Sequence, residues 1–159
     1  MENSELPRGV RAVEHTADLA IEVEARSLPE LFDRAAAGMF ALIQGADPED
    51  PEPASRDAAE RVRAAAENEE VRDVSLTASD LPSTLVAWLR ELLYFHEVDH
   101  LAYRRAAFER LTEDGTLHAR VYAAAAPSSP VREIKGVTYH QLTASRRAGS
   151  WYARVVFDV

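Results

Sequence analysis

The chain has 159 residues, of which 47% are hydrophobic, and its formal net charge at pH 7 is −9. It has no cysteine, which excludes disulfides, thiolate catalysis and thiolate metal sites. The acidic total argues against tight autonomous binding of RNA or DNA, because recognition of phosphates requires a basic surface.

The N-terminal segment, residues 1–15, contains no apolar stretch of the kind found in secretion signals, and no apolar run in the chain approaches about 18 residues. We therefore expect a cytoplasmic protein, and the length suits a single domain over residues 1–159. Residues 18–25 alternate between apolar and polar side chains, with Leu19, Ile21 and Val23 on one side, which predicts a half-buried strand.

A helix is predicted next, over residues 28–43. Ser27 and Glu30 have the spacing of a capping box, apolar residues then recur at helical spacing, and Gly45 is a plausible stop. Residues 46–70 hold three of the eight prolines and nine acidic residues against three basic ones. This composition predicts a solvated surface insertion, with a short helix possible over 57–66. The alternative is a docking segment for a basic partner.

The second half of the chain contains a further strand–helix pair and then four strands. Residues 71–78 alternate, Asp80 or Ser79 can cap the following helix, and Pro82 lies in its first turn. The helix begins at residue 81 and extends through residue 98. Strands are predicted near 104–112, 116–125, 132–143 and 151–158. The fold class expected is α+β: a two-layer sandwich with a mostly antiparallel sheet and two amphipathic helices.

Three short motifs contain residue types that bind metals or phosphates. The first, "EHTAD", places His15 and Asp18 at the start of a strand, although the pair could equally form a turn with a local hydrogen bond. The second, "IKGVTYH", places Lys135 on an otherwise apolar strand, where it could contact carboxylates or phosphate, or protect an exposed edge strand. The third, "FDV", places Asp158 next to Val159 at the end of the sequence, where the alternative is a surface aspartate on a frayed end.

No common catalytic motif is present: the sequence has no P-loop, no G-x-G-x-x-G, no H-E-x-x-H and no G-x-S-x-G. His96 and His100 are four residues apart at a predicted helix end. They could chelate a metal, or they could interact with the helix dipole.

The three motifs, in this order and together with "DLPSTLVAWLRELLY", resemble the archease family. The resemblance spans residues 13–159 and is poor in 46–70 and in 123–131. It implies a fold with a duplicated strand-helix-strand-strand unit. It also implies a non-enzymatic activator of RtcB-type RNA ligases, which promotes the GTP-dependent guanylylation of the ligase in tRNA splicing and RNA repair.

The resemblance further implies a divalent metal, reported as calcium, bound by Asp18, Asp158 and the terminal carboxylate of Val159. It links Lys135 to activity. Carboxylates are hard oxygen donors that suit calcium, magnesium or manganese. Two other classes of function stay open: a chaperone-like module with a different client, and a metal-dependent hydrolase in which Asp18 or His15 would act as the base.

Overall fold

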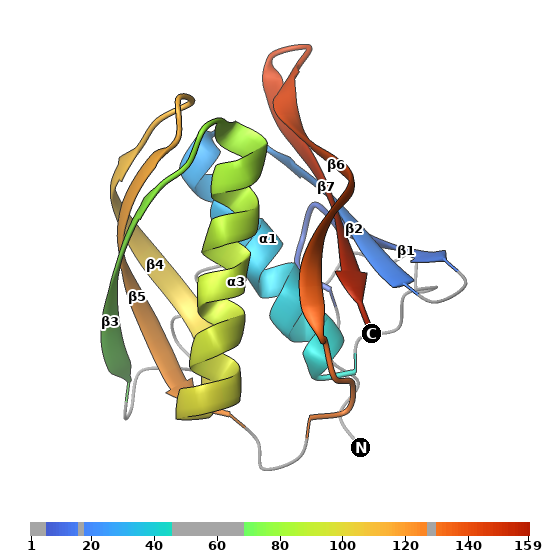
Figure 1. The fold of residues 1–159 in the computed structure, drawn as a ribbon. Coiled ribbons are helices and arrows are strands. Elements are labelled where there is room, and N and C mark those ends of the chain that lie inside the picture. The colour runs from blue at the N-terminus through green and yellow to red at the C-terminus, as the bar shows by residue number, and fades with distance from the viewer. Residues whose placement is uncertain (1–5, 16–17, 46–68, 127–129) are drawn as a thin grey trace.

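The structure is a computed structural model that describes residues 6–15, 18–45, 69–126 and 130–159. Its elements follow the order strand, strand, helix, strand, helix and then four strands (Figure 1). They are β1 (Val10–His15), β2 (Asp18–Ala25), α1 (Leu28–Ile43), β3 (Glu70–Thr77), α3 (Leu81–Asp99), β4 (Leu101–Leu111), β5 (Thr116–Ala125), β6 (Gly136–Arg147) and β7 (Ser150–Asp158).

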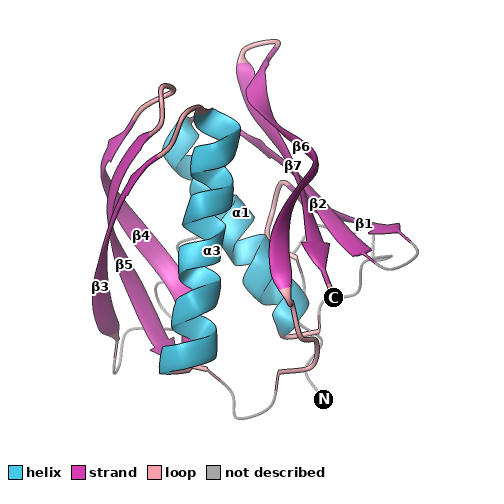
Figure 2. Cartoon of the chain, in the orientation of Figure 1, coloured by secondary structure: helices cyan, strands magenta, loops and turns pink. Residues whose placement is uncertain are grey.

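The strands form two antiparallel sheets, one in the order β1-β2-β7-β6 and one in the order β3-β5-β4. Both helices lie between the sheets (Figure 2). The α+β class with two helices and antiparallel strands is confirmed. The expected single sheet is divided into two, and the helices separate them. The reason is visible in α1, where Ala35, Ala36, Ala37 and Gly38 are all buried, so this helix requires cover on more than one side.

The expected duplication of a strand-helix-strand-strand unit is present, with one copy nested inside the other. β3-α3-β4-β5 is contiguous in sequence and forms a sheet in the order β3-β5-β4. β2-α1-β6-β7 forms the matching order β2-β7-β6, and the first unit is inserted between its helix and its third element. Both helices start alike: Ser27 Oγ accepts the Glu30 N–H at 3.3 Å, and Asp80 Oδ1 accepts the Ser83 N–H at 2.8 Å.

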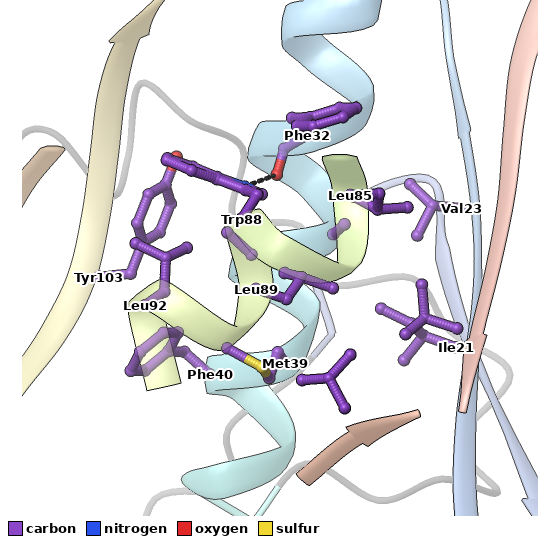
Figure 3. Close-up of a cluster of buried hydrophobic side chains, with 14 of the residues drawn as sticks. Ile21, Val23, Phe32, Met39, Phe40, Leu85, Trp88, Leu89, Leu92 and Tyr103 are labelled. Atoms are coloured by element: carbon purple, nitrogen blue, oxygen red, sulfur yellow. Dashed lines mark hydrogen bonds between the residues drawn. The ribbon is translucent and has the colours of Figure 1, made fainter. Parts of the chain in front are cut away.

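One core joins both sheets and both helices (Figure 3). Its largest fully buried side chain is Trp88 of α3, whose indole Nε1–H donates to the carbonyl oxygen of Phe32 in α1 at 3.1 Å. The Trp88 ring lies 5.3 Å from the ring of Phe108 and 6.1 Å from that of Tyr103, measured between centroids. Trp88 therefore packs α3 against α1 and β4. Its buried indole N–H has a hydrogen-bond acceptor.

Several boundaries differ from the expected ones. β1 was not predicted, although Val10 and Ala12 are buried and alternate with exposed Arg11. The strand expected from residue 132 begins at Gly136, because the preceding residues bind the end of α1 instead: the Arg132 N–H donates to the Ile43 carbonyl at 3.1 Å. Most of the acidic insertion, residues 46–68, and the possible helix over 57–66 lie outside the described residues.

Replacing Glu22 with glutamine is expected to lower the free energy of unfolding by about 1 kcal/mol at neutral pH. The hydrogen bond from Arg11 holds the pKa of the Glu22 carboxyl below its usual value of 4.5, with further hydrogen bonding from the Tyr152 hydroxyl at 3.0 Å. A carboxyl with a lowered pKa stabilises the fold above its unfolded pKa, and this stability is lost as the pH falls through the folded value.

The measurement is urea unfolding of the wild type and of Glu22→Gln at pH 7 and at steps below pH 4.5. The difference between the two proteins should shrink toward acid. A difference that stayed constant across this range would show that the carboxylate charge contributes nothing.

Candidate metal site and the adjoining groove

Residues from all three motifs lie in one row across the four-stranded sheet. Asp18 of β2 is directly opposite Asp158 of β7, and Asp158 is directly opposite Gly136 of β6 on its other side. His15 of β1 is opposite Asp18, although its side chain lies outside the described residues. Directly opposite residues point to the same face of a sheet with Cβ atoms about 5 Å apart. The carboxylates of Asp18 and Asp158 therefore share one face at close range.

Asp158 is held in place on both sides. β7 lies between β2 and β6, and its inward residues Val155 and Phe157 are completely buried. The backbone N–H of Lys135 donates to the carbonyl oxygen of Asp158 at 2.8 Å. Val159, the next residue, is 38% exposed. β7 is thus a central strand that is paired on both sides as far as Asp158. This pairing argues against the interpretation of Asp158 as part of a frayed end.

These residues fit a hard divalent cation by their chemistry. Two carboxylates on one face repel each other unless a cation or proton lies between them. The described residues contain no group of three His, Cys, Asp or Glu side chains placed to hold a metal. The third ligand expected from the sequence, a carboxylate on Val159, would be an oxygen donor one residue beyond Asp158.

His96 and His100 do not form a metal site with other side chains in the part of the chain that the structure describes. Nδ1 of His96 lies 3.2 Å from the carbonyl oxygen of Leu101, and its ring meets the ring of Phe40 edge-on. His100 caps α3 in the left-handed region, with φ of 56°. The two histidines therefore take part in the structure at the C-terminal end of α3.

A groove of about 450 Å³ adjoins the aspartates, where α3 runs beside β6. Its lining residues come from α3, from Lys135 and the start of β6, and from the end of β7: Arg90, Leu93, Tyr94, Glu97, Lys135, Gly136, Val137, Thr138, Tyr139 and Asp158. Lys135 is exposed and precedes β6, which is an edge strand of its sheet. Its position is therefore compatible both with protection of an edge and with contact to a ligand beside Asp158.

Arg90 of α3 contacts two residues of β6 in this groove. Its Nε–H and Nη2–H donate to the Val137 carbonyl at 3.1 and 2.9 Å, and its guanidinium carbon lies 5.1 Å from the centroid of the Tyr139 ring. The motifs did not reveal Arg90 or Tyr94. The available signal was an aromatic residue, Tyr94, on the polar side of an amphipathic helix.

Residues 11–159 match the family described as "Archease protein family (MTH1598/TM1083)". The chain belongs to the archease family. The archease of Methanosarcina mazei is 35% identical over 153 residues, covering 92% of this chain and 93% of the relative. The archease of Methanopyrus kandleri is 31% identical over 152 residues, covering 92% and 96%.

Solved structures share the archease fold. The solution structure of protein 1598 from Methanobacterium thermoautotrophicum has a TM-score of 0.65 at 24% identity, covering 95% of this chain and 99% of that one. The crystal structure of a Thermotoga maritima archease, described as a possible chaperone, has a TM-score of 0.50 at 18% identity, covering 92% and 94%. At these identities the likeness shows the fold alone. Neither described helix is both long and apolar enough to cross a membrane.

Gly136→Ala is expected to stabilise this archease by about 0.5 kcal/mol, because alanine reduces the conformational freedom of the unfolded chain. The position can accept a Cβ, which would meet only Asp158 Oδ2 at 3.7 Å, an ordinary contact. Thermal unfolding should show a rise of one to a few degrees. Gly9→Ala is the matched control: its φ is +78° and a Cβ would lie 2.6 Å from Arg34, so it should destabilise. A drop for Gly136→Ala would mean that the start of β6 has no room for a Cβ.

Proposed function

We propose that this archease is a non-enzymatic activator of an RtcB-type RNA ligase in the cytoplasm. In this proposal it promotes the GTP-dependent guanylylation of the ligase and so allows multiple turnovers in tRNA splicing or RNA repair. A divalent cation, calcium or alternatively magnesium or manganese, is held by Asp18, Asp158 and the terminal carboxylate of Val159. The observation that supports this most is the single row that brings together the "HTAD", "IKGVTYH" and "FDV" motifs.

In this proposal the aspartates, the strands that carry them and Lys135 have different roles. The paired strands place the two aspartates opposite each other on one face of the sheet, and the buried side chains of β7 hold the strand that carries Asp158 in place. A bound cation would supply positive charge and open coordination positions at this corner. Lys135, exposed beside Asp158, would contact an anionic group of the ligase or of its nucleotide. The acidic chain needs no basic face, because the ligase handles the RNA.

The test is a guanylylation assay that contains the RtcB-type ligase of the same organism, labelled GTP and substoichiometric archease. We expect faster label transfer to the ligase and more than one ligation per ligase molecule. No acceleration would overturn the proposal. Activity of the archease alone on phosphoesters would favour a hydrolase. Protection of unrelated proteins from aggregation, without any effect on the ligase, would favour a chaperone.

Lys135→Ala is expected to lower the stimulated guanylylation rate at least about tenfold while it changes the midpoint of thermal unfolding by little. The side chain is exposed, and surface substitutions usually change stability by about 0.5 kcal/mol or less. Lys135→Arg, which keeps the charge, should retain part of the stimulation. Equal stimulation by the alanine variant and the wild type would show that the lysine is only an edge residue.

A further inference from the structure

Two exposed tyrosines lie beside the candidate site, whereas Val71 lies on β3, in the other sheet. The large apolar residues that are exposed in the described part of the chain are Val71, Tyr94, Val98, Val131, Tyr139 and Val159. Tyr94 and Tyr139 are each 54% exposed, and both line the groove between α3 and β6. Val98 lies one helical turn beyond Tyr94, and Val159 follows Asp158. Clustered exposed apolar side chains beside a functional site are typical of a protein interface.

The same groove contains two cationic side chains that have no carboxylate partner. Among the residues that the structure describes, neither Arg90 nor Lys135 forms an ion pair, whereas Arg34 and Arg154, for example, do. Both side chains are exposed, so their positive charges face the groove and the solvent. Arg90 is also fixed in place by its two hydrogen bonds to Val137, so its charge is presented without a further loss of side-chain freedom.

We propose that the α3–β6 groove is the docking surface for the ligase, and that Tyr94 and Tyr139 are its anchors. The occupant is a segment of the ligase in which a carboxylate side chain lies beside an apolar or aromatic one. The carboxylate would meet Arg90 and Lys135, and the apolar group would cover the tyrosines. Tyrosine and arginine are the residue types that most often dominate the energy of protein interfaces. This inference rests on the proposed function and identifies the surface through which archease would bind the ligase.

The groove is less suited to RNA or to a free nucleotide. Glu97 and Asp158 line it together with the two cations, so the groove can accept one carboxylate beside Arg90 and Lys135, whereas a run of phosphates would also extend over Glu97 and Asp158 and be repelled. One face of the Tyr139 ring is occupied by Arg90, which limits stacking of a base on that side. Docking at the groove would bring the partner against Lys135 and the aspartate pair, since Lys135 and Asp158 line the same cavity.

The experiment is a titration of the ligase with full-length archease in the guanylylation assay, which separates the half-maximal concentration from the plateau. Tyr94→Ala and Tyr139→Ala should each raise the half-maximal concentration at least about tenfold, with an unchanged plateau at saturation. Tyr94→Phe and Tyr139→Phe keep the ring and should restore most of the affinity. Val71→Ala is the matched control, because Val71 is exposed on β3, on the opposite side of α3 from β6 (Figure 1).

Calorimetry with the divalent cation alone and thermal unfolding accompany the titration, and both should match the wild type for the tyrosine variants. An unchanged half-maximal concentration would overturn the docking proposal while the activator function stands. So would tyrosine-dependent binding of GTP or of a single-stranded RNA to archease alone. If the wild type itself does not stimulate the ligase, this result overturns the proposed function and therefore also the docking proposal that rests on it.

Discussion

Asp158→Asn is expected to weaken the binding of calcium at least about tenfold, the equivalent of about 1.4 kcal/mol. The substitution keeps the shape of the side chain and removes one of the negative charges that a hard cation requires. Asp18→Asn should have an effect of similar size, because the two residues are directly opposite each other on neighbouring strands. Isothermal titration calorimetry with calcium, and then with magnesium and manganese, measures the affinities.

The matched control is Asp73→Asn. Asp73 is an exposed aspartate on β3 that forms an ion pair with Arg120, and it lies in the other sheet. It should leave the affinity for the cation unchanged. Extension of the chain beyond Val159 by a few residues tests the third ligand, and it should weaken binding as the aspartate variants do. Unchanged affinity in the extended protein would remove the terminal carboxylate from the ligand set.

Trp88→Ala is expected to lower the free energy of unfolding by about 3–5 kcal/mol. The side chain is completely buried between α1, α3 and β4, and its removal would leave a cavity and remove the hydrogen bond that the Phe32 carbonyl accepts from outside its own helix. Chemical denaturation monitored by circular dichroism measures the change. A loss of this size should also lower the midpoint of thermal unfolding by about 10 °C for a domain of this length.

Trp88→Phe separates the two contributions, because it keeps most of the apolar volume and removes the indole donor. It should cost clearly less than the alanine variant. Arg120→Ala, an exposed change on β5, should cost much less than either Trp88 variant, because ion pairs at the surface contribute little to stability. A small effect of Trp88→Ala would show that the core collapses around the gap, and that the link between the two helices does not depend on this side chain.

The two helices were predictable from local information. Both begin after a side chain that caps the first turn, and both have apolar residues at helical spacing. The strand at residues 116–125 was likewise predicted with its observed bounds. β1 was missed because its alternation is short, and the start of β6 was misplaced because Arg132 and its neighbours bind the end of α1, a contact that no local pattern encodes.

The candidate site, like the fold, was only partly predictable from the sequence. The sequence motifs identified Asp18, Lys135 and Asp158 as chemically informative residues, but not that the strands would place Asp18 opposite Asp158, with Lys135 directly before Gly136 of the same row. Arg90 and Tyr94 had no motif and became visible only when α3 was placed beside β6. The pairing of β2 with β7 joins residues near the two ends of the sequence, and its register follows from which faces the sheet buries.

The order of the amino acids alone thus determined the capped helices, most strands and the residue types suited to a hard cation, because caps and hydrophobic periodicity act between near neighbours. The tertiary structure decided that the described strands divide into two sheets, that one repeat is nested in the other, and that a groove lined by Arg90 and Lys135, which form no ion pair with another described residue, adjoins the aspartate pair. Packing decides these features, because burying both sides of α1 and α3 requires strands from distant parts of the chain.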